Sequence, residues 1–239
     1  MANREKLELL LLHALPFDGS MWSRQKELLP GSTHAPDLYA LGNSVEEWAA
    51  EALKAAKGDR LIVVGCSVGG SCALELAIAA PDRVAALVLI GTKAGHRPDP
   101  ALHAGVLETL QKKGLEEAWS VFWAPLFSSS ADDHVISDAK RIALRQSPQD
   151  IARGVTAFHS RPARDQFLSA CPCPVVVVTG ADDRAPGPNV SAAQACSAKH
   201  GRLHVIPECG HYVPLERPEY LNSILRDVIT SLRNHGCTS

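Results

Sequence analysis

Short apolar runs alternate along this chain with longer amphipathic stretches, and this alternation limits the folds that the chain can adopt. The run Val84–Ile90 is apolar at every position, as in strands that are buried on both faces of a sheet. Strands separated by helix-length segments predict a parallel sheet covered by helices. The expected strands are Leu7–His13, Thr33–Pro36, Arg60–Cys66, Val84–Gly91, Pro174–Gly180 and Arg202–Pro207.

Amphipathic stretches between and after these strands are expected to be helices. Ser44, followed three residues later by Glu47, has the pattern of a capping box, which predicts that a helix begins there. The expected helices are Trp22–Leu29, Ser44–Ala56, Val68–Ala80 and Pro218–Leu232.

The segment from Lys93 to Cys173 shows no strand pattern. A structureless loop of this length is uncommon inside a compact domain, so we expect a helical insertion. Its sequence predicts four or five helices, among them Ala101–Lys113, Leu115–Trp123 and Asp132–Gln146. The predicted organisation is therefore a core of residues 1–92 and 174–239, with residues 93–173 as a helical cap over one end of the sheet.

Composition excludes several classes of protein. The 24 Lys+Arg and 26 Asp+Glu give a net charge of −2, which disfavours nucleic acid as a partner. No apolar run approaches the roughly 18–20 residues of a membrane span. Glu8 interrupts the Leu-rich N-terminal stretch and no cleavage site follows, which argues against a signal peptide. The seven cysteines show no paired Cys-x-x-Cys spacing, so we expect free thiols and a cytoplasmic protein.

The expected strand Arg60–Cys66 leads into Gly65-Cys66-Ser67-Val68-Gly69 and then into an expected helix. This is the Gly-x-Ser-x-Gly sequence in the strand–turn–helix context of a nucleophilic serine. Small residues are needed two places before and after the serine, because the strand and helix backbones crowd there. The motif therefore predicts Ser67 as the nucleophile.

Other interpretations of the same residues are weaker but remain possible. Cys66 as nucleophile would have the β-branched Val64 and Val68 at the crowded positions, and Ser71 lies a full turn into the helix. The Gly-x-Gly-x-x-Gly pattern of dinucleotide binding is not met, since Ser67 occupies the place of the middle glycine. On this motif alone, a glycine-rich turn in some other α/β protein also stays open.

Two further candidates follow later strands. Asp182 and Asp183 come directly after the expected strand Pro174–Gly180, and His211 follows the last one. The order serine, acid, histidine is that of a nucleophile, an orienting carboxylate and a general base. The sequence therefore predicts a catalytic triad.

With these motifs, the chain resembles the α/β-hydrolase superfamily of serine hydrolases over nearly its whole length. The resemblance implies the α/β-hydrolase fold, a mostly parallel sheet of about six strands flanked by helices, with the N-terminal hairpin reduced or absent. The spacing Gly180-Ala181-Asp182-Asp183 matches the family's acid loop and selects Asp183, with Ser67 and His211 as its partners.

The end of the first expected strand, Leu12-His13-Ala14-Leu15-Pro16, resembles the family's oxyanion loop, although Ala14 stands where glycine is usual. The resemblance implies that the backbone N–H groups of Leu15 and Val68 form the oxyanion hole. We expect His13 to hold this loop in place rather than to act as a second base.

By resemblance, the chain is most similar to small esterases and lactonases, the group of 3-oxoadipate enol-lactonase and acyl-homoserine-lactone hydrolases. This implies cleavage of a small carboxylic ester or lactone through an acyl-enzyme on Ser67. No organic cofactor or metal is expected, and the sequence does not indicate an oligomeric state. The alternatives are hydroxynitrile-lyase-like or perhydrolase activity on the same triad, or a non-catalytic ligand receptor.

Aromatic residues are concentrated in the helical insertion. Trp119, Phe122 and Trp123 have the i, i+3, i+4 spacing of one helix face, which is typical of packing. Because the insertion is expected to cover the site, we nevertheless predict that these three residues and Phe158 line an apolar substrate pocket. For His159, Arg161 and Arg164, a solvated surface is the stronger expectation.

Overall fold

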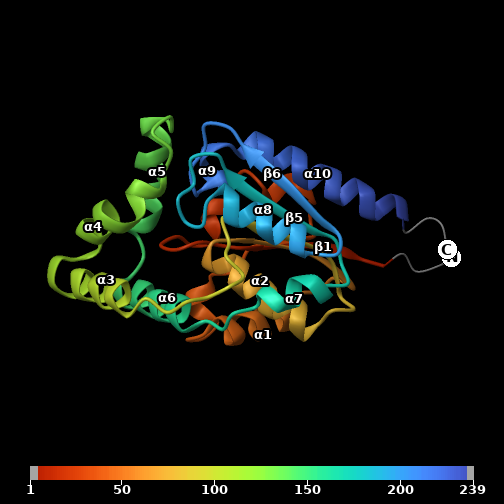
Figure 1. Cartoon of the computed structure of the whole chain (residues 1–239), viewed down its shortest axis with the longest axis horizontal. Helices are drawn as coiled ribbons and strands as arrows, with labels where there is room; N and C mark the ends of the chain where they lie inside the picture. The colour runs from red at the N-terminus through yellow and green to blue at the C-terminus, as the bar shows by residue number, and fades with distance from the viewer. Residues whose placement is uncertain (1–4, 236–239) are drawn as a thin grey trace.

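The computed structural model describes residues 5–235, in which six parallel strands form one sheet in the order β2-β1-β3-β4-β5-β6 (Figure 1). All six strands lie where the sequence predicts them, within one or two residues. β6 is at one edge of the sheet and is largely exposed, whereas β4 is buried along its whole length. The strands are β1 Leu7–Leu12, β2 Thr33–His34, β3 Arg60–Cys66, β4 Val84–Ile90, β5 Val175–Gly180 and β6 Gly201–Ile206.

The parallel register brings the carboxyl ends of the strands to a single edge of the sheet. In the β1–β3 pair, Leu12 lies opposite Gly65, and in the β3–β4 pair Cys66 lies opposite Ile90. Loops that follow β1, β3, β5 and β6 therefore meet at this edge, where ligands bind in open α/β sheets.

Helices cover both faces of the sheet. α1 and α2 lie on one face and α10 lies on the other (Figure 1). Ser44 caps α1 as predicted, because its hydroxyl accepts a hydrogen bond from the Glu47 amide. These helices are α1 Val45–Ala55, α2 Val68–Ala79, α8 Pro188–Ser197, α9 Val213–Glu216 and α10 Pro218–His235.

Between β4 and β5 the chain forms only helices and turns. α3 to α6 project beyond one end of the sheet, whereas α7 lies beside the core helix α8 (Figure 1). The helices are α3 Pro100–Lys113, α4 Leu115–Ala118, α5 Asp133–Ala143, α6 Pro148–Ser160 and α7 Asp165–Ala170. None of the helices within residues 5–235 has the length and apolar character that crossing a membrane requires.

One expected helix is wrong, and a second changes its helix type partway along. The expected helix Trp22–Leu29 is replaced by the 3₁₀ turns Gly19–Trp22 and Lys26–Leu28. Met21 and Trp22 are both fully buried, and the Asp18 carboxylate accepts a hydrogen bond from the Ser20 amide at the start of the first of these turns. The expected helix Leu115–Trp123 ends at Ala118 and continues as a π-helix over Trp119–Trp123.

Candidate active site

Ser67 occupies the turn between β3 and α2 in a strained conformation. Its φ of 54° and ψ of −118° lie in a region that side-chain-bearing residues rarely adopt. The crowding expected around it is present: a Cβ on Gly65 would lie 2.3 Å from the Gly69 carbonyl oxygen, and a Cβ on Gly69 would lie 2.2 Å from that of Leu12. The sequence therefore folds into a turn that only small residues permit and that presents the serine at the edge of the sheet.

Asp183 and His211 lie in contact at the ends of β5 and β6. The Nδ1 atom of His211 is 3.1 Å from Oδ1 and 3.3 Å from Oδ2 of Asp183, and both side chains are buried. Asp182 does not share this contact, since its carboxylate accepts a hydrogen bond from the Ser128 hydroxyl at 2.5 Å. The geometry therefore places Asp183, and not Asp182, where it can orient the imidazole.

The surroundings of Asp183 favour its ionised form. Burial raises the pKa of this carboxyl, but the hydrogen bond and charge of His211, the Ala185 amide at 2.8 Å and the Thr179 hydroxyl together hold it below its usual value. A carboxylate that stays charged beside Nδ1 directs the proton of the neutral imidazole to that nitrogen. The Nε2 atom of His211 is then left as the proton acceptor.

The loop after β1 is held by buried hydrogen bonds. The Leu38 amide donates to Nε2 of His13 at 2.9 Å, and the other ring nitrogen lies 3.2 Å from the Ala14 carbonyl oxygen. Ala14 does not need the conformational freedom of glycine, because its φ is not positive. Leu15 follows directly, and its carbonyl accepts a hydrogen bond from the Tyr212 hydroxyl at 3.2 Å. The loop is thus fixed beside the residue that follows His211.

An apolar cavity of about 190 Å³ borders both Ser67 and His211. Of the four aromatic residues predicted to line a pocket, Phe122, Trp123 and Phe158 line this cavity. Trp119 does not, because its ring packs against those of Phe17 and Phe127 instead. The remaining lining residues are Leu15, Leu102, Val106, Leu126, Val155, His159, Ala185 and Tyr212.

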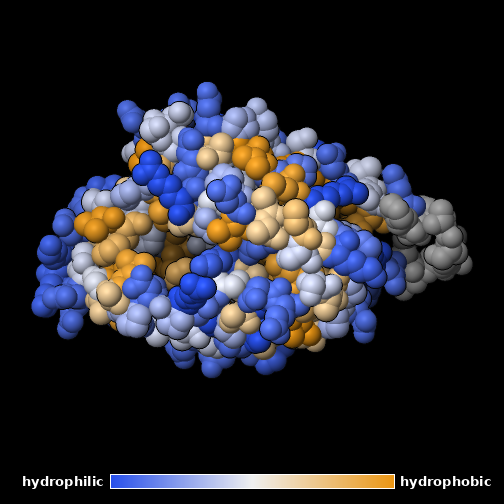
Figure 2. All heavy atoms as spheres, viewed as in Figure 1, coloured by the Kyte–Doolittle hydropathy of each residue, from blue (hydrophilic) through white to orange (hydrophobic). Residues whose placement is uncertain are grey.

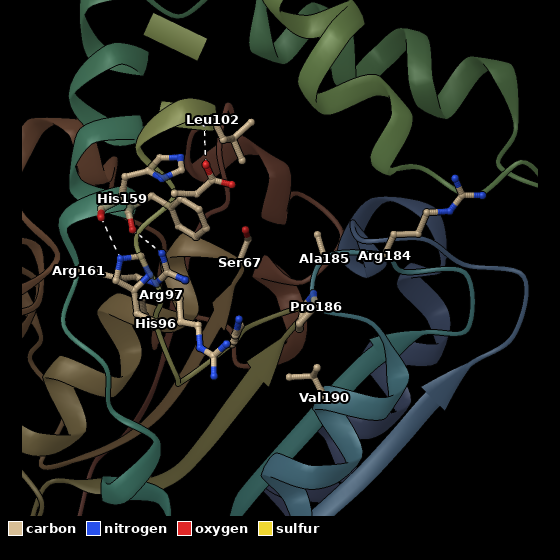
Figure 3. Close-up of a pocket in the computed structure, with 15 residues that line it drawn as sticks. Ser67, His96, Arg97, Leu102, His159, Arg161, Arg184, Ala185, Pro186 and Val190 are labelled. Carbon is tan, nitrogen blue, oxygen red and sulfur yellow. Dashed lines mark hydrogen bonds between the residues drawn. The ribbon is translucent and has the colours of Figure 1, made fainter. Parts of the chain in front are cut away.

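A second cavity, of about 350 Å³, also borders Ser67 and is more polar (Figure 3). His159 and Arg161 line it, and Arg161 is buried, contrary to the solvated position expected for it. Arg164 lies elsewhere and forms a two-point salt bridge with Glu75 of α2, at 2.7 and 3.0 Å. Of the three polar residues weighed from the sequence, His159 and Arg161 therefore border the site.

Glu216 was missed by the sequence reasoning. Its buried carboxylate accepts hydrogen bonds from the amides of Ser128, Gly210 and Tyr212, at 2.9 to 3.1 Å. The His211 amide in turn donates to the Leu126 carbonyl at 2.9 Å. Glu216 therefore joins the histidine loop to the 126–128 turn. No single-residue signal identifies this role, because the partners are backbone amides and one of them, that of Ser128, is 88 residues away in the sequence.

The competing nucleophiles are placed less favourably than Ser67. Cys66 is fully buried, and burial raises the pKa of its thiol, which disfavours the reactive thiolate. Ser71 lies within α2 and is buried, although it contributes to the wall of the polar cavity. Among residues 5–235, no group of three or more His, Cys, Asp or Glu side chains is arranged to hold a metal ion.

Comparison with known proteins identifies the family and the fold. A family model described as "Alpha/beta hydrolase family" matches residues 9–224. A Bacillus subtilis protein provisionally named 2-succinyl-6-hydroxy-2,4-cyclohexadiene-1-carboxylate synthase is 26% identical over 92% of this chain and 89% of its own. The structure of a thermophilic esterase from Thermogutta terrifontis superposes with a TM-score of 0.83 at 26% identity, covering 95% of this chain and 91% of that one. The enol-lactonase of Burkholderia xenovorans LB400 shares the fold, with a TM-score of 0.81 at 17% identity over 96% and 94% of the two chains.

Proposed function

The chain belongs to the alpha/beta hydrolase family, and from this premise we propose that it hydrolyses small carboxylic esters or lactones through an acyl-enzyme on Ser67. One observation carries the proposal. The strained Ser67 borders the same apolar cavity as His211, and Nδ1 of His211 is bonded to the buried carboxylate of Asp183. A nucleophile and a base at one cavity, with an acid that orients the base, are the requirements of covalent acyl transfer.

In this mechanism Nε2 of His211 takes the proton of the Ser67 hydroxyl as the oxygen attacks the ester carbonyl. Asp183 keeps the imidazole in the required tautomer and stabilises the imidazolium that forms. His211 then passes the proton to the departing alcohol. A water molecule then attacks the acyl carbonyl as His211 takes its proton, and His211 returns that proton to the Ser67 oxygen as the acid is released.

In this proposal, backbone N–H groups stabilise the negative charge of the tetrahedral intermediate. Val68 is the first residue of α2, where helix amides lack intrahelical acceptors. Leu15 borders the cavity shared by Ser67 and His211. We assign the oxyanion hole to these two amides, and loss of one such donor typically costs roughly 10²–10³ in rate.

The shape of the cavity supports small substrates. Its volume of about 190 Å³ lies below the roughly 300–1,000 Å³ of drug-sized ligand pockets. Phe122, Trp123 and Phe158 make its wall aromatic. A short acyl chain or a small ring would fit this space, whereas a long fatty acyl chain would not.

The proposal is tested with p-nitrophenyl esters of two to eight acyl carbons and with γ-lactones. We expect turnover of short esters or lactones by the natural protein, and loss of that turnover in Ser67→Ala. Ser169→Ala is the matched control, because it removes an exposed hydroxyl from α7, outside both cavities. A fluorophosphonate probe should label Ser67. Turnover that persists in Ser67→Ala, or a label on Cys66 or Ser71, would show the mechanism to be wrong.

A second candidate is a non-hydrolytic reaction on the same residues. It is favoured by the relative named as a synthase. A cyanohydrin substrate included in the same assays addresses the lyase form of this alternative. Cleavage of the cyanohydrin without any ester or lactone hydrolysis would favour it over the hydrolase.

A further inference from the structure

Two cavities of different character meet at Ser67. They share the walls formed by Leu102, Phe158, His159 and Ala185. The smaller cavity is apolar, whereas the larger one is lined by several cationic side chains. Figure 2 shows this face hollowed between the projecting helices and the end of the sheet, with hydrophobic atoms deep inside and strongly hydrophilic atoms at the rim. A substrate that spans Ser67 would therefore meet a different environment on each side.

The cations of the larger cavity lack carboxylate partners. Within residues 5–235, Lys93, Arg97 and Arg161 form no salt bridge. The one carboxylate in the cavity wall is that of Asp99, which accepts a hydrogen bond from the Leu102 amide at the start of α3. Arg184 also borders the cavity, but its side chain extends away from Ser67 (Figure 3). The wall thus carries an excess of positive charge.

Arg161 is the most constrained of these cations. It is 6% exposed, its guanidinium carbon lies 3.9 Å above the centre of the Phe158 ring, and one Nη donates to the Phe158 carbonyl. Its Nε has no hydrogen-bond partner among the described residues. Burial lowers the pKa of this guanidinium to about 10, so it remains charged at neutral pH. A buried charge without a counterion is costly, and a bound anion would offset that cost.

The positive charge of Arg161 also lowers the pKa values of two neighbouring histidines. Burial, His103 and Arg161 lower the pKa of His159 to about 4. Burial and Arg161 also lower the pKa of His96. His96, Arg97 and Arg161 lie on one side of Ser67, and Ala185 and Pro186 lie on the other (Figure 3). The positive charge is therefore concentrated on a single side of the nucleophile.

We propose that the substrate carries a carboxylate, which binds in the larger cavity to Arg161, with Lys93 and Arg97 contributing charge, while an apolar part occupies the smaller cavity. The inference rests on the proposed function, because it names the substrate class of that site. A guanidinium presents parallel donors that match a carboxylate. Asp99 in the same wall disfavours a doubly charged group such as a phosphate. Lys93 and Arg97 are exposed and also border a neighbouring hollow, so Arg161 is expected to dominate.

The test compares anionic esters with neutral esters of matched shape. Mono-p-nitrophenyl adipate against p-nitrophenyl hexanoate places the carboxylate on the acyl part, and 4-acetoxybenzoate against its methyl ester places it on the alcohol part. For one of these pairs we expect kcat/KM to be at least tenfold higher for the anionic member at low salt. That ratio should fall as sodium chloride is added, because ions screen the attraction.

Three variants locate the effect. Arg161→Gln should reduce the ratio of kcat/KM values at least tenfold. The double variant Lys93→Gln/Arg97→Gln should also reduce this ratio, and because both residues are exposed, the change should not impair folding. Arg153→Gln changes the net charge by the same amount as Arg161→Gln but at an exposed position of α6, and it should leave the ratio unchanged. Ratios of one or less for both pairs, or ratios that neither cavity variant changes, would overturn the proposal.

A binding measurement separates this inference from the proposed function. Monomethyl adipate should bind Ser67→Ala more tightly than dimethyl adipate does, and adding Arg161→Gln should remove the difference. If the natural protein hydrolyses neither these four esters nor the short esters and γ-lactones of the first assay, the proposed function fails, and isothermal titration calorimetry of Ser67→Ala with the two adipate esters alone decides the carboxylate site. Equal binding of the two adipate esters by Ser67→Ala would then reject the site.

Discussion

Replacing Gly69 by alanine adds one methyl group at the point where α2 passes closest to the end of β1. The new Cβ would lie 2.2 Å from the Leu12 carbonyl oxygen and 2.5 Å from that of His13. Ordinary contacts of such an atom begin at 3.4 Å, so both separations are about 1 Å too short. The atoms in the way belong to the backbone, and no side-chain rotation can remove the overlap.

The expected cost follows from what must move. Overpacking of a rigid interior typically costs about 1–3 kcal/mol, and backbone obstacles place this site at the upper end. At roughly 2–4 °C per kcal/mol for a chain of this size, the melting temperature should fall by about 6–12 °C. Relief by shifting the loop after β1 would displace Leu15 from its place in the cavity wall. A misplacement of about 1 Å in an active site costs roughly 10²-fold in rate.

Thermal unfolding and steady-state ester hydrolysis measure the two effects. Gly105→Ala is the matched control, because Gly105 lies inside α3 with no atom within 4 Å of an added Cβ. That variant should raise the stability by about 0.5–1 kcal/mol, since alanine favours a helix over glycine. The reasoning would be refuted if Gly69→Ala kept both the melting temperature and the kcat of the natural protein.

Further predictions concern the acid and a salt bridge. Asp183→Asn should lower kcat by about 10³–10⁴ with the fold retained in circular dichroism, because the amide favours the wrong tautomer of His211; a loss below tenfold would contradict the assigned role. The pKa of Asp183 is lower in the folded chain than in the unfolded one. The free energy of unfolding should therefore fall as the pH drops through about 4. Denaturant titrations should show a smaller fall of this free energy at acid pH in Asp183→Asn. Arg164→Met leaves the carboxylate of Glu75 buried and unpaired. Urea unfolding should therefore show a free energy of unfolding that is lower by about 1–3 kcal/mol. An unchanged midpoint would mean that the salt bridge does not contribute to stability.

Much of the sheet could be predicted because its strands are buried on both faces. β3 covers the same residues, Arg60–Cys66, that its apolar run predicts. The segment after β1 could not be predicted in this way. Its residues have ordinary helix propensities, but the chain forms short 3₁₀ turns there, with Met21 and Trp22 buried against the core and Asp18 capping the first turn. Tertiary packing overrides local preference there.

The candidate site also contains residues that local sequence predicts and residues whose positions depend on tertiary packing. The candidate triad Ser67, Asp183 and His211 could be predicted from motifs, because each residue follows the end of a predictable strand. The sequence favours a solvated position for Arg161, because arginine side chains are mostly exposed. The spacing from Phe158 to Arg161, three residues at the end of α6, is the one local signal for the stacked arrangement that buries the guanidinium.

The hydrogen bonds of Glu216 have a consequence for the design of chimeras between this protein and its relatives. Through Glu216 and the Leu126 carbonyl, the loop that carries His211 rests on the turn at residues 126–128. Exchanging residues 93–173 for the equivalent segment of a relative would therefore change the position of His211 as well as the substrate pocket. Chimeras of this chain should keep the 126–128 turn and residues 210–216 from the same parent. Substrate choice and catalytic geometry are in this sense inherited together.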